Sequence, residues 1–151
     1  DRPQSRRVRM MYERAYGKNY DANMDIKDIA KEVRKMLKAE MPEFKFAVRI
    51  ERYAGGQSLN IGIKEVPAGF RFVRDNPNEF ERDYRPMVWT EELRDAQEKA
   101  RAIGMRFNYD GSDIMTDYFD VNYYCHASVE YDTPAFYQQR EQENEFRKEA
   151  A

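Results

Sequence analysis

Cysteine and histidine are nearly missing from this sequence of 151 residues, in which Cys125 and His126 are the only ones of their kind. A single cysteine excludes an intrachain disulfide framework and favours a reducing compartment. One cysteine and one histidine also cannot supply the four ligands of a usual zinc site. No serine or cysteine nucleophile with a recognisable local signature accompanies His126, so the sequence does not indicate a catalytic triad.

The chain also lacks a long hydrophobic run and a strong net charge. No apolar stretch approaches the roughly 20 residues that span a bilayer, and no signal-peptide core is visible. We therefore expect a cytoplasmic protein with no membrane partner. The net charge is only −2 and the mean hydropathy is −0.99. With no global field to attract nucleic acid, any such binding must come from a local patch.

Residues 44–67 predict one antiparallel β-hairpin. Apolar and polar residues alternate on both sides of the Gly-Gly pair at 55–56, which can take the positive φ angles of a two-residue turn. With both glycines in the turn, Ile50 lies opposite Ile61, and the apolar side chains of the two strands share one face.

Three helices and a further strand are predicted around this hairpin. The first helix covers 25–41, where apolar residues recur at three- and four-residue spacing. The second begins after Thr90 as N-cap and ends with Gly104 at C′. A strand at 121–131 then precedes a polar helix opened by the Thr-Pro pair at 133–134. These elements predict a two-layer α+β domain, with an antiparallel sheet built on the Gly-Gly hairpin and helices packed on one face, in the order helix–strand–strand–helix–strand–helix.

The chain divides into three predicted parts, which are a basic N-terminal arm at 1–24, the α+β domain at 25–131 and the polar helix at 132–151. Residues 68–89 read as an irregular insertion, which its aromatic residues Phe70, Phe72, Phe80 and Tyr84 predict to pack against the body. A short strand is also expected at 105–109.

Cations gather in two places. Five of them fall together on the first predicted helix, beside its apolar stripe, and these are Lys27, Lys31, Arg34, Lys35 and Lys38. The arm adds Arg6, Arg7 and Arg9. Such clusters can bind phosphates. They also occur as the ordinary solvated face of a helix and as a solvated tail.

The stretch at 110–120 holds four aspartates, of which Asp110, Asp113 and Asp117 are candidate metal ligands. The spacing begins like a calcium loop but fails at its sixth and twelfth positions. Turns in which aspartates cap their own backbone amides explain the composition equally well. Tyr118 and Tyr124, near His126, could stack on bases or simply fill a sheet face.

The run from DIAKEVRKMLKAEMPEFKF through YAGGQSLNIGI, followed by YDGSDIMTDYFDVNYY, resembles the large polyvalent-protein-associated domains of phages and conjugative elements. The shared features are the basic helix ending at a proline, the hairpin with its Gly-Gly pair, and the aspartate-rich motif. The resemblance covers about residues 25–124. It implies a mobile-element context and a binding or accessory role. The family has no established catalytic residues to carry over to this chain, and we expect no cofactor.

Three functions follow as hypotheses. The first is a non-enzymatic accessory module of a phage or mobile element that engages nucleic acid through the basic helix face. The second is a protein-interaction module, either an inhibitor of a host defence system or a subunit of a larger assembly. The third is a metal-dependent nuclease or hydrolase built on the aspartate cluster.

Overall fold

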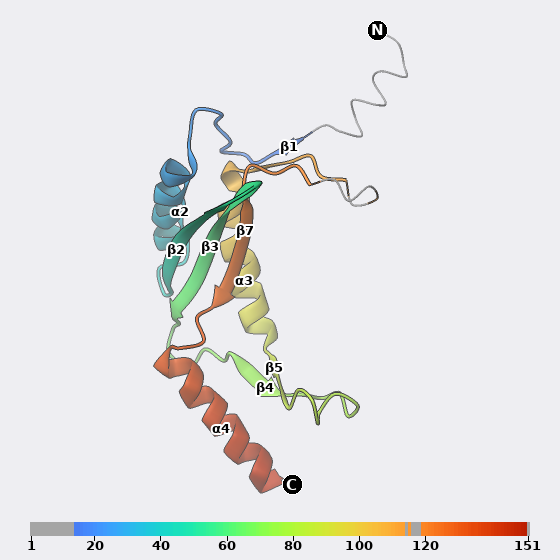
Figure 1. Cartoon of the computed structure of the whole chain (residues 1–151). Helices are drawn as coiled ribbons and strands as arrows, with labels where there is room; N and C mark the ends of the chain where they lie inside the picture. The colour runs from blue at the N-terminus through green and yellow to red at the C-terminus, as the bar shows by residue number, and fades with distance from the viewer. Residues whose placement is uncertain (1–13, 114, 116–118, 151) are drawn as a thin grey trace.

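The computed structural model describes residues 14–113, 115 and 119–150 (Figure 1). Its elements, in chain order, are β1 (Ala15–Tyr16), α2 (Ile26–Glu40), β2 (Lys45–Tyr53), β3 (Gly56–Glu65), β4 (Val73–Asp75), β5 (Met87–Trp89), α3 (Glu91–Gly104), the 3-10 helix η1 (Met105–Phe107), β6 (Tyr109–Asp110), β7 (Tyr124–Val129) and α4 (Pro134–Ala150). None of the helices in these ranges has the length and apolar character needed to cross a membrane.

The central sheet has the strand order β2–β3–β7, and the ribbons β1–β6 and β4–β5 stand apart from it. β2 and β3 pair antiparallel, whereas β3 and β7 pair parallel, with Leu59 opposite Cys125. The predicted α+β class is confirmed, but the sheet is mixed instead of purely antiparallel. The reason is the connection through α3, which returns the chain to the end of the sheet where β3 began.

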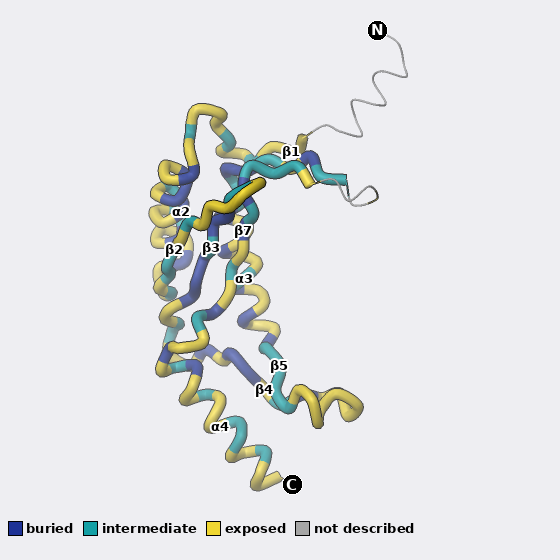
Figure 2. The backbone as a smooth tube through the Cα atoms, in the orientation of Figure 1, coloured by how far each residue is buried: buried dark blue, intermediate teal, exposed yellow. Residues whose placement is uncertain are grey.

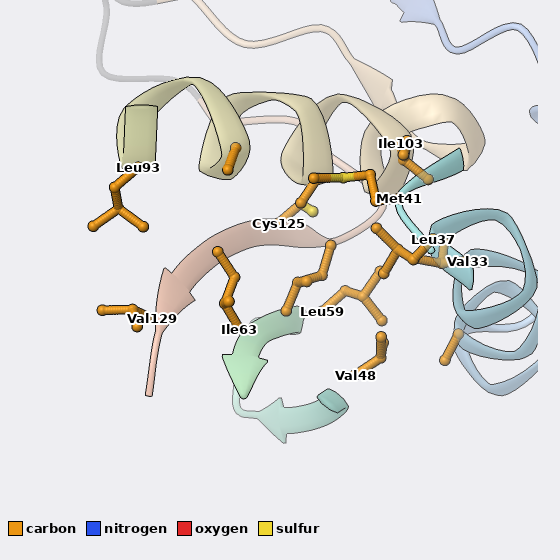
Figure 3. Close-up of a cluster of buried hydrophobic side chains, with 14 of the residues drawn as sticks. Val33, Leu37, Met41, Val48, Leu59, Ile63, Leu93, Ile103, Cys125 and Val129 are labelled. Atoms are coloured by element: carbon orange, nitrogen blue, oxygen red, sulfur yellow. The ribbon is translucent and has the colours of Figure 1, made fainter. Parts of the chain in front are cut away.

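α2 and α3 cover one face of this sheet, and α4 lies beyond its end against β4 (Figure 1). The core lies between the two helices and the sheet, where buried stretches of these elements alternate with exposed ones (Figure 2). Apolar side chains from all five elements point into it (Figure 3). α2 is capped by Asp25, the first residue of the predicted helix, whose carboxylate accepts the backbone N–H of Asp28 at 2.9 Å. Thr90 caps α3 in the same way through the N–H of Leu93.

The predicted hairpin forms, but its turn and register are wrong by two residues. Tyr53 pairs with Gly56, so the turn is Ala54-Gly55, and Gly55 has a positive φ of 89°. Ile50 consequently faces Leu59 instead of Ile61. Because side chains alternate with a period of two, this shift leaves the same residues on the apolar face.

Gly104 does not end α3 in the left-handed conformation that a C′ glycine takes. Its φ is −62°, and the chain continues into η1, where a short strand was predicted. The glycine is instead required by packing. A Cβ built on it would lie 2.6 Å from the Sγ of Cys125 and 3.0 Å from the Cδ1 of Ile61. α3 can therefore approach β3 and β7 closely only with glycine at this position.

The predicted irregular insertion is in part a small hairpin, β4–β5, on which α4 docks. Phe70 and Phe72 are buried as expected, but the prediction was wrong for Phe80 and Tyr84, whose exposures are 91% and 88%. Phe136 anchors the first turns of α4, because its ring contacts those of Phe72, next to β4, and Trp89 of β5. α4 is therefore attached along its first half.

Replacing Gly104 with alanine tests the close approach of α3 to the sheet. Overpacking at this contact is expected to lower the free energy of unfolding by about 1–3 kcal/mol, measured by urea denaturation. Cys125→Ala removes the nearest clashing atom. In that background, Gly104→Ala should therefore lower the free energy of unfolding by less than it does in the wild type. Purely additive effects of the two substitutions would contradict this packing.

Candidate nucleic-acid interface

The first predicted site is the exposed side of α2. The apolar residues of this helix, at Ile26, Ile29, Ala30, Val33 and Leu37, are buried against the sheet and α3. The five predicted cations, Lys27, Lys31, Arg34, Lys35 and Lys38, are all exposed. We call them the α2 basic face. Its position follows from the amphipathic pattern, since burying one stripe of a helix turns the adjacent one to water.

Two members of the α2 basic face have partners within the molecule. Arg34 donates from Nη2 to the carbonyl oxygen of Val48 at 2.7 Å, which ties the helix to the edge strand β2. Lys35 lies 3.5 Å from Glu32 in an exposed pair that contributes little to stability. Lys27, Lys31 and Lys38 form no ion pair with any residue that the structure describes. Three ammonium groups are thus available to an anionic ligand.

A groove of about 660 Å³ lies beside this face, between the second half of α2 and the β2–β3 pair. Its apolar lining includes Leu37, Phe44 and Phe46, and its cations include Arg34 and Lys38 of the α2 basic face. β2 and β3 contribute two more cations, Lys45 and Lys64, across from the helix. Lys45 is 3.4 Å from the carboxylate of Glu65. Sequence reasoning missed both lysines, although the pairing of the two strand ends brings them together.

A second glutamate of α2, Glu40, is engaged by a cation of another element. Glu40, near the end of the helix, pairs with Arg106 of η1 through both carboxylate oxygens. The hydrogen bonds from Arg106, and then its positive charge, lower the pKa of Glu40 below its ordinary value. This carboxylate is held by a cation outside the α2 basic face, so it cancels less of that face's charge than its place in the sequence suggests.

The second predicted cluster of cations is on the basic arm. Arg6, Arg7 and Arg9 lie outside the described residues. Arg14, the first described residue, donates to both carboxylate oxygens of Asp120, at 2.7 and 3.1 Å, and lies 3.9 Å above the ring of Tyr109. These contacts fasten the beginning of β1 to the segment around β6.

The aspartate cluster is organised by its own turns. Asp110 accepts the backbone N–H of Ser112 at 2.8 Å, and Asp113 accepts that of Met115 at 3.0 Å. Asp117 lies outside the described residues. Within the described ranges, no three acidic, histidine or cysteine side chains are grouped as metal ligands.

Asn108, the first position of the failed calcium pattern, is a buried structural residue. Its side-chain amide donates to the carbonyl of Tyr123 at 2.7 Å and accepts the backbone N–H groups of Tyr109 and Asn122. It therefore joins β6 to the start of β7. No local pattern distinguishes this role, because asparagine is also common in exposed turns.

His126 and Cys125 face opposite sides of β7, as the alternation predicts. His126 is exposed, whereas Cys125 is buried under α3. Burial raises the pKa of the Cys125 thiol to about 11. A thiol with this pKa is almost entirely protonated at neutral pH and is a poor nucleophile.

The buried thiol gives a direct test of this packing. At pH 8, three pH units below its pKa, roughly one Cys125 thiol in a thousand is ionised. We expect an aromatic disulfide reagent to label the native protein far more slowly than the protein unfolded in urea. Native labelling as fast as that of a small free thiol would contradict the burial of Cys125.

The fold is that of an α+β domain, and a comparison with family models identifies its family. The model of the family described as large polyvalent protein associated domain 29 matches residues 24–133. The chain belongs to this phage-associated family of accessory domains, as the resemblance predicted. Neither a curated protein nor a solved structure matches the chain.

Proposed function

We propose that this domain is a non-enzymatic accessory module that binds nucleic acid through the α2 basic face and the adjoining groove. The observation that carries the proposal is the set of three exposed lysines on one helix face, Lys27, Lys31 and Lys38, whose ammonium groups pair with no described carboxylate. At this face the lysine ammonium groups would pair with the phosphates of a nucleic acid and release the counterions condensed on them.

The rest of the surface fits a local rather than a global attraction. The chain has a net charge of −2, so the acids elsewhere repel a polyanion and leave the α2 basic face as the preferred contact. Arg34 is already fixed by its bond to Val48, so its position is set before a ligand arrives. Lys45 and Lys64 of the groove extend the same positive surface beyond the helix.

A charge-reversed variant tests this proposal. Lys27→Glu, Lys31→Glu and Lys38→Glu together should weaken binding of labelled 20-nucleotide single strands and 20-base-pair duplexes, measured by fluorescence anisotropy at 50 and 200 mM salt. Arg34 is left intact because it holds the helix to β2. Losing three phosphate contacts should reduce the slope of log affinity against log salt by about 2–3.

The matched control reverses three exposed cations on α3 and α4, Lys99→Glu, Arg140→Glu and Lys148→Glu, which changes the net charge equally. It should bind nearly as well as the wild type. An equal loss in this control, or wild-type binding that is insensitive to salt, would count against the α2 basic face.

A second candidate function, protein recognition, is favoured by the connection between β4 and β5. We call residues 76–86 the β4–β5 tip. Phe80 and Tyr84 are 91% and 88% exposed there, yet the backbone that presents them is well held. The buried side chain of Asn76 donates to the carbonyl of Arg85 at 2.8 Å and accepts the N–H of Asn78 at 3.0 Å. Ordered loops that expose aromatic side chains are typical of protein-binding sites.

Substituting the two aromatic residues separates binding from stability. Phe80→Ser with Tyr84→Ser should change the free energy of unfolding by no more than about 0.5 kcal/mol, because both side chains are in water. If the tip binds protein, immobilised wild type should retain a bacterial protein that this variant loses. The control, Tyr137→Ser with Phe146→Ser on α4, should retain it. Identical retention by all three proteins would exclude the tip.

A further inference from the structure

The central sheet has a second face that the proposed interface does not use. α2 and α3 cover one face, and the opposite face, turned towards the viewer in Figure 1, carries no helix among the described residues. Side chains that point to this open face alternate with the core residues along β2, β3 and β7. They include the exposed Arg49 and Glu51 of β2 and the exposed His126 of β7.

An ion pair lies across the open face towards one end, and two aromatic rings lie at the other end. Arg49 of β2 pairs with Glu130, whose side chain lies over Gly62 of β3. At the hairpin end, Tyr53 and Tyr124 approach Gly56 from the strands on either side. A Cβ on Gly56 would lie 3.2 Å from Cε2 of Tyr53 and 3.6 Å from Cε2 of Tyr124.

The missing side chain of Gly56 thus lets both rings lie against the backbone of β3. Tyr53 is 46% exposed, and Tyr124 is half-buried. Partial burial, and then the neighbouring Tyr124 and Glu51, raise the pKa of Tyr53, as expected for adjacent rings. The floor next to them is made of small and polar side chains, because Ser58 pairs with Tyr124 and Asn60 pairs with His126.

This aromatic end lies beside the start of the α2 basic face. α2 runs antiparallel to β2, since Arg34 reaches Val48 while Asp25, at the beginning of the helix, is near Arg52. Lys27 and Lys31, one turn apart, therefore lie alongside the part of β2 that ends at Tyr53. β2 is an edge strand, so no further strand separates the lysines from the rings.

We infer that Tyr53 and Tyr124 form a stacking site for the bases of a single-stranded nucleic acid whose phosphates lie along the start of α2. The inference rests on the proposed function and names its ligand class. Aromatic rings beside a cationic track are the usual means by which proteins hold unpaired bases. In a duplex the faces of the bases are occupied by their neighbours, so the same rings contribute little. Asn60 and His126 supply hydrogen-bonding groups on the adjoining row.

The test compares tyrosine variants on two probes, a labelled 12-nucleotide oligo(dT) and a 12-base-pair duplex. Tyr53→Leu with Tyr124→Leu should weaken oligo(dT) binding about tenfold or more and leave duplex binding within about twofold of the wild type. Tyr53→Phe with Tyr124→Phe should keep the affinity for oligo(dT), because stacking needs the ring and not the hydroxyl. The control Tyr137→Leu removes a tyrosine of similar exposure, 49%, from α4 and should change neither affinity.

The outcomes separate this inference from the proposed function. Unchanged oligo(dT) affinity in the leucine variant, or an equal loss on both probes, would overturn the stacking site while leaving the α2 basic face in place. If the wild type binds neither probe, both the stacking site and the proposed function are overturned. Thermal unfolding of each variant measures whether the fold is retained, and the single substitutions Tyr53→Leu and Tyr124→Leu provide the same test should the double leucine variant destabilise the hairpin end.

Discussion

The burial of one face of the β2–β3–β7 sheet under α2 and α3 is the constraint on which the rest of the molecule depends. It fixes the rotation of α2, since the stripe from Ile26 to Leu37 must enter the core, and so it turns the lysines of that helix towards water at the edge of β2. It also requires α3 to approach β7 closely at Gly104. Because interiors are packed to nearly crystalline density, these two helices hold the surface features in fixed positions.

The α2 basic face and the exposed aromatic residues of the β4–β5 tip are thereby separated along the molecule. The α2 basic face flanks the sheet, whereas the β4–β5 tip projects beyond it, on the side where α4 lies (Figure 1). α4 and the β4–β5 hairpin stabilise each other, since Gln139 accepts the N–H of Phe72 at 2.6 Å and donates to the carbonyl of Phe70. The two surfaces proposed here for nucleic acid and for protein are therefore far enough apart in the fold not to overlap.

Local signals in the sequence predicted the fold well where the chain itself decides the outcome. Thr90 is recognisable as a cap because its effect reaches only three residues along the chain. The register of the hairpin was less predictable, since a Gly-Gly pair permits a turn on either side and a shift of two keeps the apolar face. The parallel pairing of β7 and the groove lysines Lys45 and Lys64 arise from contacts between distant segments. Phe80 looked like a core residue because hydrophobicity alone does not distinguish burial from presentation.

The most direct test of the central claim, that α2 presents the ligand-binding surface, is a titration of the isotopically labelled protein with an unlabelled single-stranded oligonucleotide, followed by backbone amide chemical shifts. We expect the shifts to concentrate on α2, on the β2 residues that flank it and at the hairpin end, with a weaker response at higher salt. Shifts confined to the β4–β5 tip and α4, or none at oligonucleotide concentrations well above the protein's, would contradict the account.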